Sequence, residues 1–429
     1  MLKRYKIKKS NFAFTLILYK LIFDLIYNNV FVPIFSYNMG EVNFSIMKYL
    51  VSWVMYLIII IILNRIKNEI LNSSAFIAII FAISPSLSII GLKGVSWYTA
   101  TIAYIYWTLL IVALFIMQYL KITERKKIEM LINNNAIISI CNIILIPCAL
   151  FIIFISGRYT GFRMFISLDV YDIRSDFAQI SLPSIINYAL VFVGYVFLPF
   201  IFTLYLEYKK YLLAIVTLFL GVMQFSLDGA KSILTIYLMI IGINFLYNRK
   251  KSYVSTMKYL TSGIISIMLL LWVFYIFGDI TLAALMYRTF AIPQQISFNY
   301  VDFIRVNEAL LLRDSILRHF AESPYGIRFS YFITGNKSNA NNGLLGDAYA
   351  NFKFLGVLIY PFAIAIVFKI LEKFLVNFNK VTRISIITIL FWNCLNSSYF
   401  TWLLSGGVIL YMIVIYVVES AGFMGNKKG

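Results

Sequence analysis

Residues 211–247 read YLLAIVTLFLGVMQFSLDGAKSILTIYLMIIGINFLY. This stretch of 37 residues is apolar except for a short polar break at Leu227-Asp-Gly-Ala-Lys231. A helix needs about 20 apolar residues to cross a bilayer, so the stretch is too long for one spanning helix and just long enough for two. We therefore predict two membrane helices joined by a tight turn at the membrane surface.

The rest of the chain repeats this pattern of apolar stretches separated by polar connections. The pattern predicts an all-α polytopic integral membrane protein with about 12 transmembrane helices, and we treat residues 1–429 as a single transmembrane domain. The predicted spans are Asn11–Pro33, Ser45–Leu63, Ala75–Leu92, Trp97–Leu120, Ala136–Ser156, Pro183–Leu206, Tyr211–Ser226, Ser232–Tyr247, Met257–Phe277, Gly346–Leu371, Ile384–Asn396 and Thr401–Val418.

The overall composition excludes a water-soluble protein. Hydrophobic residues make up 61% of the chain and charged residues 13%, whereas soluble domains carry about 45–50% apolar and about 25% charged residues. The net charge of +19 is not a nucleic-acid footprint here, because basic residues of membrane proteins gather in cytoplasmic loops. The three cysteines lie in apolar runs and form no disulfide or zinc pattern: Cys141, Cys148 and Cys394.

The distribution of basic residues predicts the orientation of the protein. Twelve spans place both termini on one side of the membrane. The segments on that side hold 23 of the 37 Lys and Arg residues, the opposite side holds 13, and Lys20 lies within a span. Because cytoplasmic segments carry the basic excess, we predict that both termini are cytoplasmic.

Two of the predicted outer segments are long, namely Gly157–Leu182 and Gly278–Leu345. The second has 68 residues and lies between predicted helices nine and ten. Long connections in compact proteins are usually functional. Apolar residues recur within it at helical spacing, which predicts an amphipathic helix on the outer interface, with a plain solvated loop as the alternative. These residues are Phe303, Val306, Leu310, Leu317 and Phe320.

Several cations lie in the predicted outer segments, although basic residues of membrane proteins are usually concentrated in cytoplasmic segments. A function in binding an anion would explain them. Guanidinium groups bind phosphate and carboxylate bidentately, and the diphosphate of a lipid would lie at this depth. The alternative is pairing with local acids. Lys231 also stands at the predicted start of a helix, where free N–H groups favour an anion. The candidate diphosphate- and sugar-binding residues are Arg158, Arg163, Arg174, Lys231, Arg288, Tyr300 and Arg328, and further outer arginines are Arg305, Arg313 and Arg318.

Two residues are candidates for proton transfer. Asp347 opens predicted helix ten, where it is either a partner of the helix dipole or a general base. His319, the single histidine, is either structural or catalytic. Within the predicted spans only Lys20 and Asp24 are firmly central, and their spacing of four favours a structural pair over a transport role. No metal site is predicted.

Four short motifs carry a resemblance to a known family. They are Val170-Tyr-Asp-Ile-Arg174, Asp228-Gly-Ala-Lys-Ser232, Arg288-Thr-Phe with Tyr300-Val-Asp-Phe303, and Gly346-Asp-Ala-Tyr-Ala-Asn-Phe352 with Leu355-Gly356. In their order and their twelve-span setting they resemble the O-antigen polymerase (Wzy) family of oligosaccharide repeat-unit polymerases. The resemblance covers residues from about 158 to 357. Lys353 departs from it, because a glycine is expected there.

The resemblance implies a GT-C-like fold in the bacterial cytoplasmic (inner) membrane. It implies undecaprenyl-diphosphate-linked oligosaccharides as substrates, membrane lipid and a chain-length regulator protein as partners, and no nucleic acid or cofactor. A sugar hydroxyl would displace the lipid diphosphate from a growing chain with inversion and without a metal. The outer cations would stabilise the departing diphosphate, and Asp347 or His319 would accept the proton.

Two other functions fit the same layout. One is a flippase for the same lipid-linked units, in which cations would line the interior of the helices. The other is an O-antigen ligase, which shares the chemistry but transfers the chain to a lipid A core acceptor. The single cation within a span, Lys20, and the long outer loop favour the polymerase.

Overall fold

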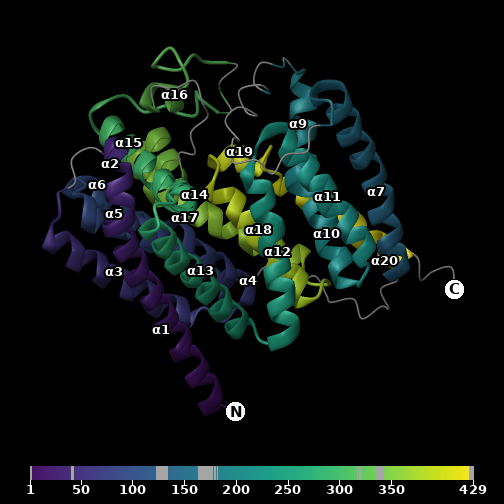
Figure 1. Cartoon of the computed structure of the whole chain (residues 1–429), viewed down its shortest axis with the longest axis horizontal. Coiled ribbons are helices and arrows are strands. Elements are labelled where there is room, and N and C mark those ends of the chain that lie inside the picture. The colour runs from purple at the N-terminus through teal and green to yellow at the C-terminus, as the bar shows by residue number, and fades with distance from the viewer. Residues whose placement is uncertain are drawn as a thin grey trace. The chain divides into compact units, whose positions relative to one another are not determined.

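The structure is a computed structural model that describes residues 2–39, 43–121, 134–162, 177, 180, 182–315, 317, 320–334 and 343–424. Every regular element among these residues is a helix (Figure 1). The predicted all-α class is therefore confirmed. His319, Arg163 and Arg174, which the sequence suggests as site residues, lie outside the described residues.

The chain forms two compact units, whereas the sequence predicts a single transmembrane domain over residues 1–429. Unit 1 comprises residues 1–122, 246–370 and 391–401, and unit 2 comprises residues 123–245, 371–390 and 402–429. Each unit is assembled from three separate segments of the chain. No linker composition marks their limits, because the boundaries at residues 245, 370, 390 and 401 fall inside helices.

Unit 1 is built around the N-terminal helices. Helix α1 lies along α13, α3 packs against α5 and α6, and the segment from α4 to α5 is almost entirely buried (Figure 1). Its elements are α1 (Leu2–Ile26), η1 (Tyr27–Phe31), α2 (Val32–Met39), α3 (Ile46–Arg65), α4 (Glu69–Ala78), η2 (Ile79–Ile83), α5 (Ser84–Lys93), α6 (Trp97–Met117), α13 (Tyr253–Ile276), α14 (Thr281–Met286), η5 (Tyr287–Ala291), α15 (Ile292–Val306), α16 (Phe329–Thr334) and most of α17 (Gly343–Phe374).

Unit 2 contains a second set of apolar helices. Helix α10 packs against α11 and α7, and α20 packs against α7. Its elements are α7 (Asn134–Ile155), η3 (Ser156–Thr160), α9 (Ser184–Phe192), η4 (Val193–Phe197), α10 (Leu198–Glu207), α11 (Tyr211–Asp228), most of α12 (Lys231–Lys250), most of α18 (Lys380–Leu395), the end of α19 (Tyr399–Leu403) and α20 (Val408–Met424).

Ten helices among the described residues are long and apolar enough to cross a membrane. Two further predicted spans are helical but shorter. The apolar part of α11 runs from Tyr211 to Leu227, and α18 has 16 residues. The chain is thus a multi-pass membrane protein by the length and composition of its helices, and the count of twelve stays a prediction.

Several helices contain a π-helical turn, and prolines explain where most of these occur. Proline has no N–H group, and its ring clashes with the carbonyl four residues earlier. Widening the preceding turn relieves that clash. A proline stands two residues after four of the π-helical turns η1, η2, η4 and η5, at Pro33, Pro85, Pro199 and Pro293.

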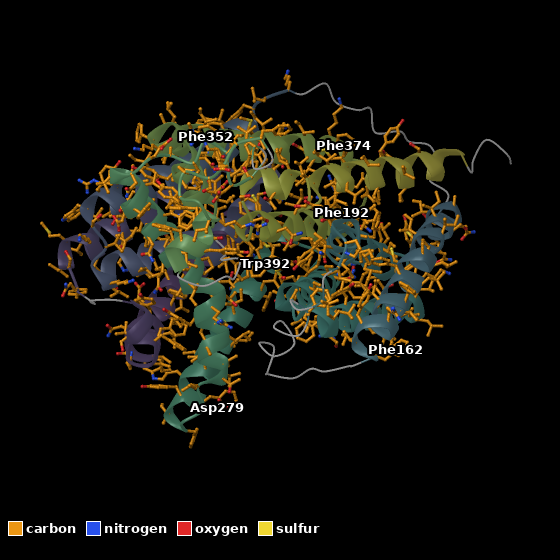
Figure 2. The ribbon with its side chains drawn as sticks, turned by 90° about the horizontal axis from the view of Figure 1, so that it is seen from above. Phe162, Phe192, Asp279, Phe352, Phe374 and Trp392 are labelled. Carbon is orange, nitrogen blue, oxygen red and sulfur yellow. The ribbon has the colours of Figure 1, made fainter. Side chains whose placement is uncertain are left out.

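The segment Gly278–Leu345, predicted to be an outer loop, contains a long helical stretch, but not where the sequence predicts it. Elements α14, η5 and α15 follow each other from Thr281 to Val306, after the exposed Asp279 at the end of α13 (Figure 2). The predicted amphipathic helix from Phe303 to Phe320 is wrong, because α15 ends at Val306. Leu311 and Leu312 beyond it have positive φ angles of 50° and 66°, which a right-handed helix cannot contain.

The predicted pair of Lys20 and Asp24 is confirmed. The Lys20 Nζ atom lies 3.0 Å from both carboxylate oxygens of Asp24, and the lysine is fully buried. The ammonium group also lies 4.5 Å from the ring centre of Trp53 and donates to the Ser88 hydroxyl at 3.3 Å. The charge is thereby balanced inside the protein.

Candidate functional site

Asp347 is a buried carboxylate in the first turns of α17, with 4% of its surface exposed. The Asn351 side-chain amide donates to its Oδ1 atom at 3.0 Å, and the backbone N–H of Tyr399 donates to Oδ2 at 2.9 Å. A carboxylate has about four acceptor positions, so two hydrogen bonds leave capacity for a further donor. The arrangement holds an acceptor group in a fixed orientation, and no ion pair joins it to a cation of the described residues.

Close packing of two helices places Asp347 beside α15. The position where a Cβ atom on Gly346 would stand is 3.1 Å from the Cα atom of Ser297, which is closer than side chains normally approach. Glycine therefore favours this near approach of the start of α17 to α15, since a side chain here would be in tight contact with Ser297.

Tyr300 lies near Asp347 and contacts Phe329. Its phenol is buried, and its ring packs edge-on against Phe329 with centres 4.5 Å apart. Burial, followed by the nearby carboxylates of Asp314 and Asp347, raises the pKa of the Tyr300 phenol above its ordinary value. Tyr300 is therefore a neutral hydroxyl at physiological pH, placed near two carboxylates.

An arginine lies on an aromatic pair at the same part of unit 1. The Arg305 guanidinium is 4.4 Å from the ring centre of Tyr98, and the Tyr98 hydroxyl is 2.7 Å from that of Tyr349. Tyr349 follows Asp347 by two residues on α17. The neighbouring Asp302 accepts hydrogen bonds from the hydroxyls of Ser96, at 3.1 Å, and of Thr99. Arg305 is exposed, so its outward edge can hold an anion in bidentate fashion.

Arg288 stands elsewhere on the same helical stretch. It lies 17 residues before Arg305, which corresponds to about 25 Å along a helix. Its π-helical turn η5 is held by Tyr287, whose hydroxyl donates to Gln295 at 3.0 Å and whose ring stacks on Phe35 at 4.3 Å. Arg288 is exposed, and its distance from Arg305 separates the two guanidinium groups.

The predicted site residues thus fall into three groups. In unit 1, Asp347 and Tyr300 lie together, and Arg328 is next to Phe329, which contacts Tyr300. In unit 2, Arg158 is exposed on η3, and Lys231 is the first residue of α12. Arg288 lies on η5 of unit 1, and Arg163, Arg174 and His319 lie outside the described residues.

Sequence reasoning missed several neighbours of Asp347. Asn351 is four residues from Asp347 on the same helix, so its contact follows from the helical repeat and was discoverable. Tyr399 is about 50 residues from Asp347 along the chain, and no local pattern indicates it. Arg305 was visible as an outer arginine, but only the fold distinguishes it from the others.

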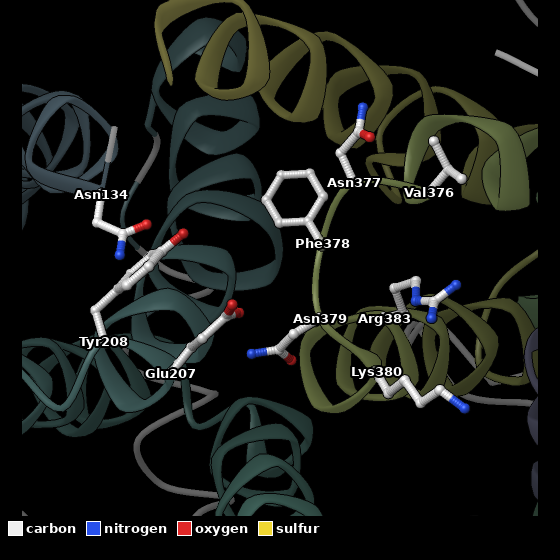
Figure 3. Close-up of a pocket in the computed structure, with 9 residues that line it drawn as sticks. All are labelled: Asn134, Glu207, Tyr208, Val376, Asn377, Phe378, Asn379, Lys380 and Arg383. Atoms are coloured by element: carbon white, nitrogen blue, oxygen red, sulfur yellow. The ribbon is translucent and has the colours of Figure 1, made fainter. Parts of the chain in front are cut away.

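A separate pocket of about 630 Å³ opens in unit 2 (Figure 3). The end of α10 contributes Glu207, whose carboxylate accepts a hydrogen bond from the Thr382 hydroxyl. Phe378 points into the middle of the pocket in the close-up. The lining combines one carboxylate with a lysine, an arginine and three amides, and so selects no single charge of ligand. The lining residues are Asn134, Glu207, Tyr208, Val376, Asn377, Phe378, Asn379, Lys380 and Arg383.

The described residues contain no group of three or more His, Cys, Asp or Glu side chains placed to hold a metal ion. Comparison with protein-family models, with curated proteins and with solved structures finds no match to this chain.

Proposed function

We propose that the protein polymerises oligosaccharide repeat units linked to undecaprenyl diphosphate, by glycosyl transfer on the outer side of the cytoplasmic membrane. The observation that carries this proposal is that unit 1 holds both a fixed, buried acceptor group, Asp347, and an exposed arginine on an aromatic pair, Arg305. The product would be an O-antigen or a capsular polysaccharide, and the transfer would be inverting and independent of a metal.

The reaction needs a general base and a group that stabilises the leaving diphosphate, and residues of unit 1 would supply both. A hydroxyl oxygen of the acceptor unit attacks the anomeric carbon of the donor chain, and the bond from that carbon to the diphosphate oxygen breaks. Asp347 takes the hydroxyl proton as general base. The diphosphate leaves with the bonding electrons, and the guanidinium of Arg305 stabilises the charge that develops.

The distance between Arg288 and Arg305 suits a reaction with two lipid diphosphates. The donor diphosphate leaves at the reacting carbon, whereas the acceptor diphosphate is separated from its reacting hydroxyl by a whole repeat unit. Arg305, on the Tyr98–Tyr349 pair of the same unit, would hold the donor. Arg288, about 25 Å along the helical stretch, would hold the acceptor.

The distribution of buried cations favours the polymerase over the flippase. Among the described residues the buried cations are Lys20 and Lys48. Lys20 is neutralised by Asp24, and Lys48 donates to the backbone carbonyl of Val95 near the end of its helix at 2.5 Å. A flippase for diphosphates would need cations along its path, because a charged headgroup is costly to move through a membrane.

The test uses purified protein in liposomes with undecaprenyl-diphosphate-linked repeat units, without nucleotide or added metal. We expect a ladder of longer lipid-linked products. Translocation without elongation would establish the flippase instead, and transfer only to an added lipid A core acceptor would establish the ligase.

The role of Asp347 is tested by the Asp347→Asn variant. Loss of a general base lowers the elongation rate by about 100-fold or more, and asparagine preserves the shape of the side chain. Asp279→Asn is the matched control, because Asp279 is exposed on the same unit and asparagine also serves at a helix start. Elongation by Asp347→Asn at the rate of the control would remove Asp347 from the site.

The two arginines are tested with a long lipid-linked chain as donor and single repeat units as acceptor. Arg305→Ala and Arg305→Lys should both lower kcat by about tenfold or more, because lysine lacks the guanidinium fork. Arg288→Ala should chiefly raise KM for the single unit. Identical kinetic changes in both positions would contradict separate donor and acceptor sites.

A further inference from the structure

Helix α17 is broken one turn after Asp347. Phe352 has φ −135° and ψ 16°, and Lys353 has φ 49° and ψ −133°, neither of which is helical. A break leaves the carbonyl groups of the preceding turn without helical partners. Two of these carbonyls accept hydrogen bonds from the outer loop, Ala350 from the N–H of Leu310 at 2.9 Å and Asn351 from the N–H of Leu311 at 3.3 Å. The loop backbone thereby completes the broken helix.

The loop adopts an unusual backbone to reach these carbonyls. Leu311 and Leu312 both have positive φ angles, a region that leucine rarely enters. Such conformations persist only where surrounding contacts hold them. The turn is closed by a hydrogen bond from the N–H of Arg313 to the carbonyl of Leu310 at 3.0 Å, and the Arg313 side chain lies 3.4 Å from Glu308.

Asn351 connects this loop to Asp347. Its side-chain oxygen accepts from the backbone N–H of Leu312 at 2.9 Å. Its amide nitrogen donates to the Asp347 carboxylate at 3.0 Å and to the Asp347 carbonyl at 2.9 Å. Asn351 is buried, and both the oxygen and the nitrogen of its side-chain amide make hydrogen bonds. Release of the loop would free the amide to rotate away from Asp347.

We propose that Asn351 is a positioning residue that makes the orientation of Asp347 depend on docking of the loop backbone at Leu310–Leu312. The inference rests on the proposed function for the consequence in catalysis. The mechanical link between loop and carboxylate stands on the contacts alone. Asp347 is then oriented for proton transfer only while the outer loop is docked on α17.

The link is tested by hydrogen–deuterium exchange on the full-length protein in lipid. In Asn351→Ala the amide of Leu312 loses its acceptor, and we expect exchange of the segment 310–312 to rise by about tenfold. Asn351→Asp keeps the acceptor oxygen but cannot donate to Asp347. That variant should raise the exchange of 310–312 less than Asn351→Ala does, because Leu312 keeps its acceptor, and should still lose about tenfold or more in elongation rate.

A matched control is Asn307→Ala. Asn307 is on the same loop, and its side chain donates to the carbonyl of Phe303 at 2.8 Å, with no contact to α17. Exchange at 310–312 and elongation should both stay within about twofold of the wild type. If Asn351→Ala behaves like this control in both measurements, the proposal is overturned. Loss of elongation in Asn351→Ala without faster exchange also overturns it, because Asn351 would then act without the loop.

A reciprocal variant separates this inference from the proposed function. Coupling between two groups works in both directions. Asp347→Leu removes the carboxylate acceptor of the Asn351 amide and leaves it only the backbone carbonyl of residue 347, so exchange at 310–312 should rise even if the wild-type protein elongates no chain. Unchanged exchange in Asp347→Leu would disprove the link, whatever reaction the protein carries out.

Discussion

At the scale of single residues, Lys20 shows how this membrane protein keeps a charge in its interior. The ammonium group has a carboxylate on one side and the ring of Trp53 on the other. The Tyr49 hydroxyl donates to the Asp24 carboxylate at 3.2 Å. Removal of one partner of a buried ion pair leaves the other uncompensated, whereas removal of both leaves only a packing change.

The first prediction concerns this pair. Lys20→Met should lower the free energy of unfolding by about 3–5 kcal/mol, because Asp24 is left buried and unpaired. The double variant Lys20→Met/Asp24→Leu should recover most of that loss. Thermal unfolding in detergent measures both. A double variant no more stable than Lys20→Met alone would argue against an ion pair as the reason for the loss.

At the scale of elements, the break in α17 decides the geometry around Asp347. Where a Cβ atom on Gly356 would stand, the carbonyl oxygen of Ala348 is only 1.9 Å away. The break therefore requires a glycine at 356 to bring the two turns together. Lys353 occupies a backbone region that favours glycine, at the position where the family resemblance leads one to expect glycine.

The second prediction follows from the backbone of Lys353. Lys353→Gly should raise the free energy of unfolding by about 1 kcal/mol, since relief of the strain exceeds the entropic cost of glycine. Lys353→Val should lower it, because a β-branched side chain tolerates a positive φ least. Unfolding midpoints in detergent are the measurement, and equal midpoints for the two variants would show that position 353 is unstrained.

The third prediction concerns Gly356. Gly356→Ala should lower the free energy of unfolding by about 1–3 kcal/mol, because the added methyl group overlaps a backbone carbonyl. Gly263→Ala is the control, since nothing lies within 4 Å of the position a Cβ atom would take there. That variant should be neutral or slightly stabilising, because alanine favours a helix. Equal stability of the two variants would contradict a close approach at Gly356.

At the scale of the whole molecule, the charge bias and the helix count together predict which segments face each side. The connection between α10 and α11 and the end of α12 belong to the cytoplasmic side in this arrangement, and the α13–α14 turn belongs to the outer side. The three natural cysteines are all buried, namely Cys141, Cys148 and Cys394. Cysteines introduced at exposed positions therefore report orientation with little background.

The fourth prediction uses this background in cells. Asp279→Cys should react with a membrane-impermeant maleimide added from outside, whereas Lys209→Cys should react only after permeabilisation. Ala230→Cys, in the turn between α11 and α12, should react from outside if α11 spans the membrane. Labelling of Lys209→Cys in intact cells would reverse the predicted orientation. Protection of Ala230→Cys would remove α11 and α12 as an outer hairpin.

Much of the fold was predictable because the bilayer imposes one simple requirement. Each spanning helix must be apolar over a fixed length, and this leaves a direct trace in the sequence. All twelve predicted stretches are mainly helical, with a break at Phe352–Lys353 in the tenth and a turn at 404–407 in the twelfth, and the spacing of Lys20 and Asp24 predicted their contact. The end of α15 was not predictable, because apolar residues continue at helical spacing while two leucines turn the backbone out of the helix.

The candidate site was predictable only in part. Composition and neighbours along the chain were enough to predict the membrane class, the helical stretches and Asp347 as a candidate site residue. The packing of the helices decided that Tyr399 donates to Asp347, that Arg305 lies on the Tyr98–Tyr349 pair, and that Leu310–Leu312 closes the break in α17. Those contacts join residues far apart in the chain, so they depend on how helices pack, and packing leaves no periodic signal in a single sequence.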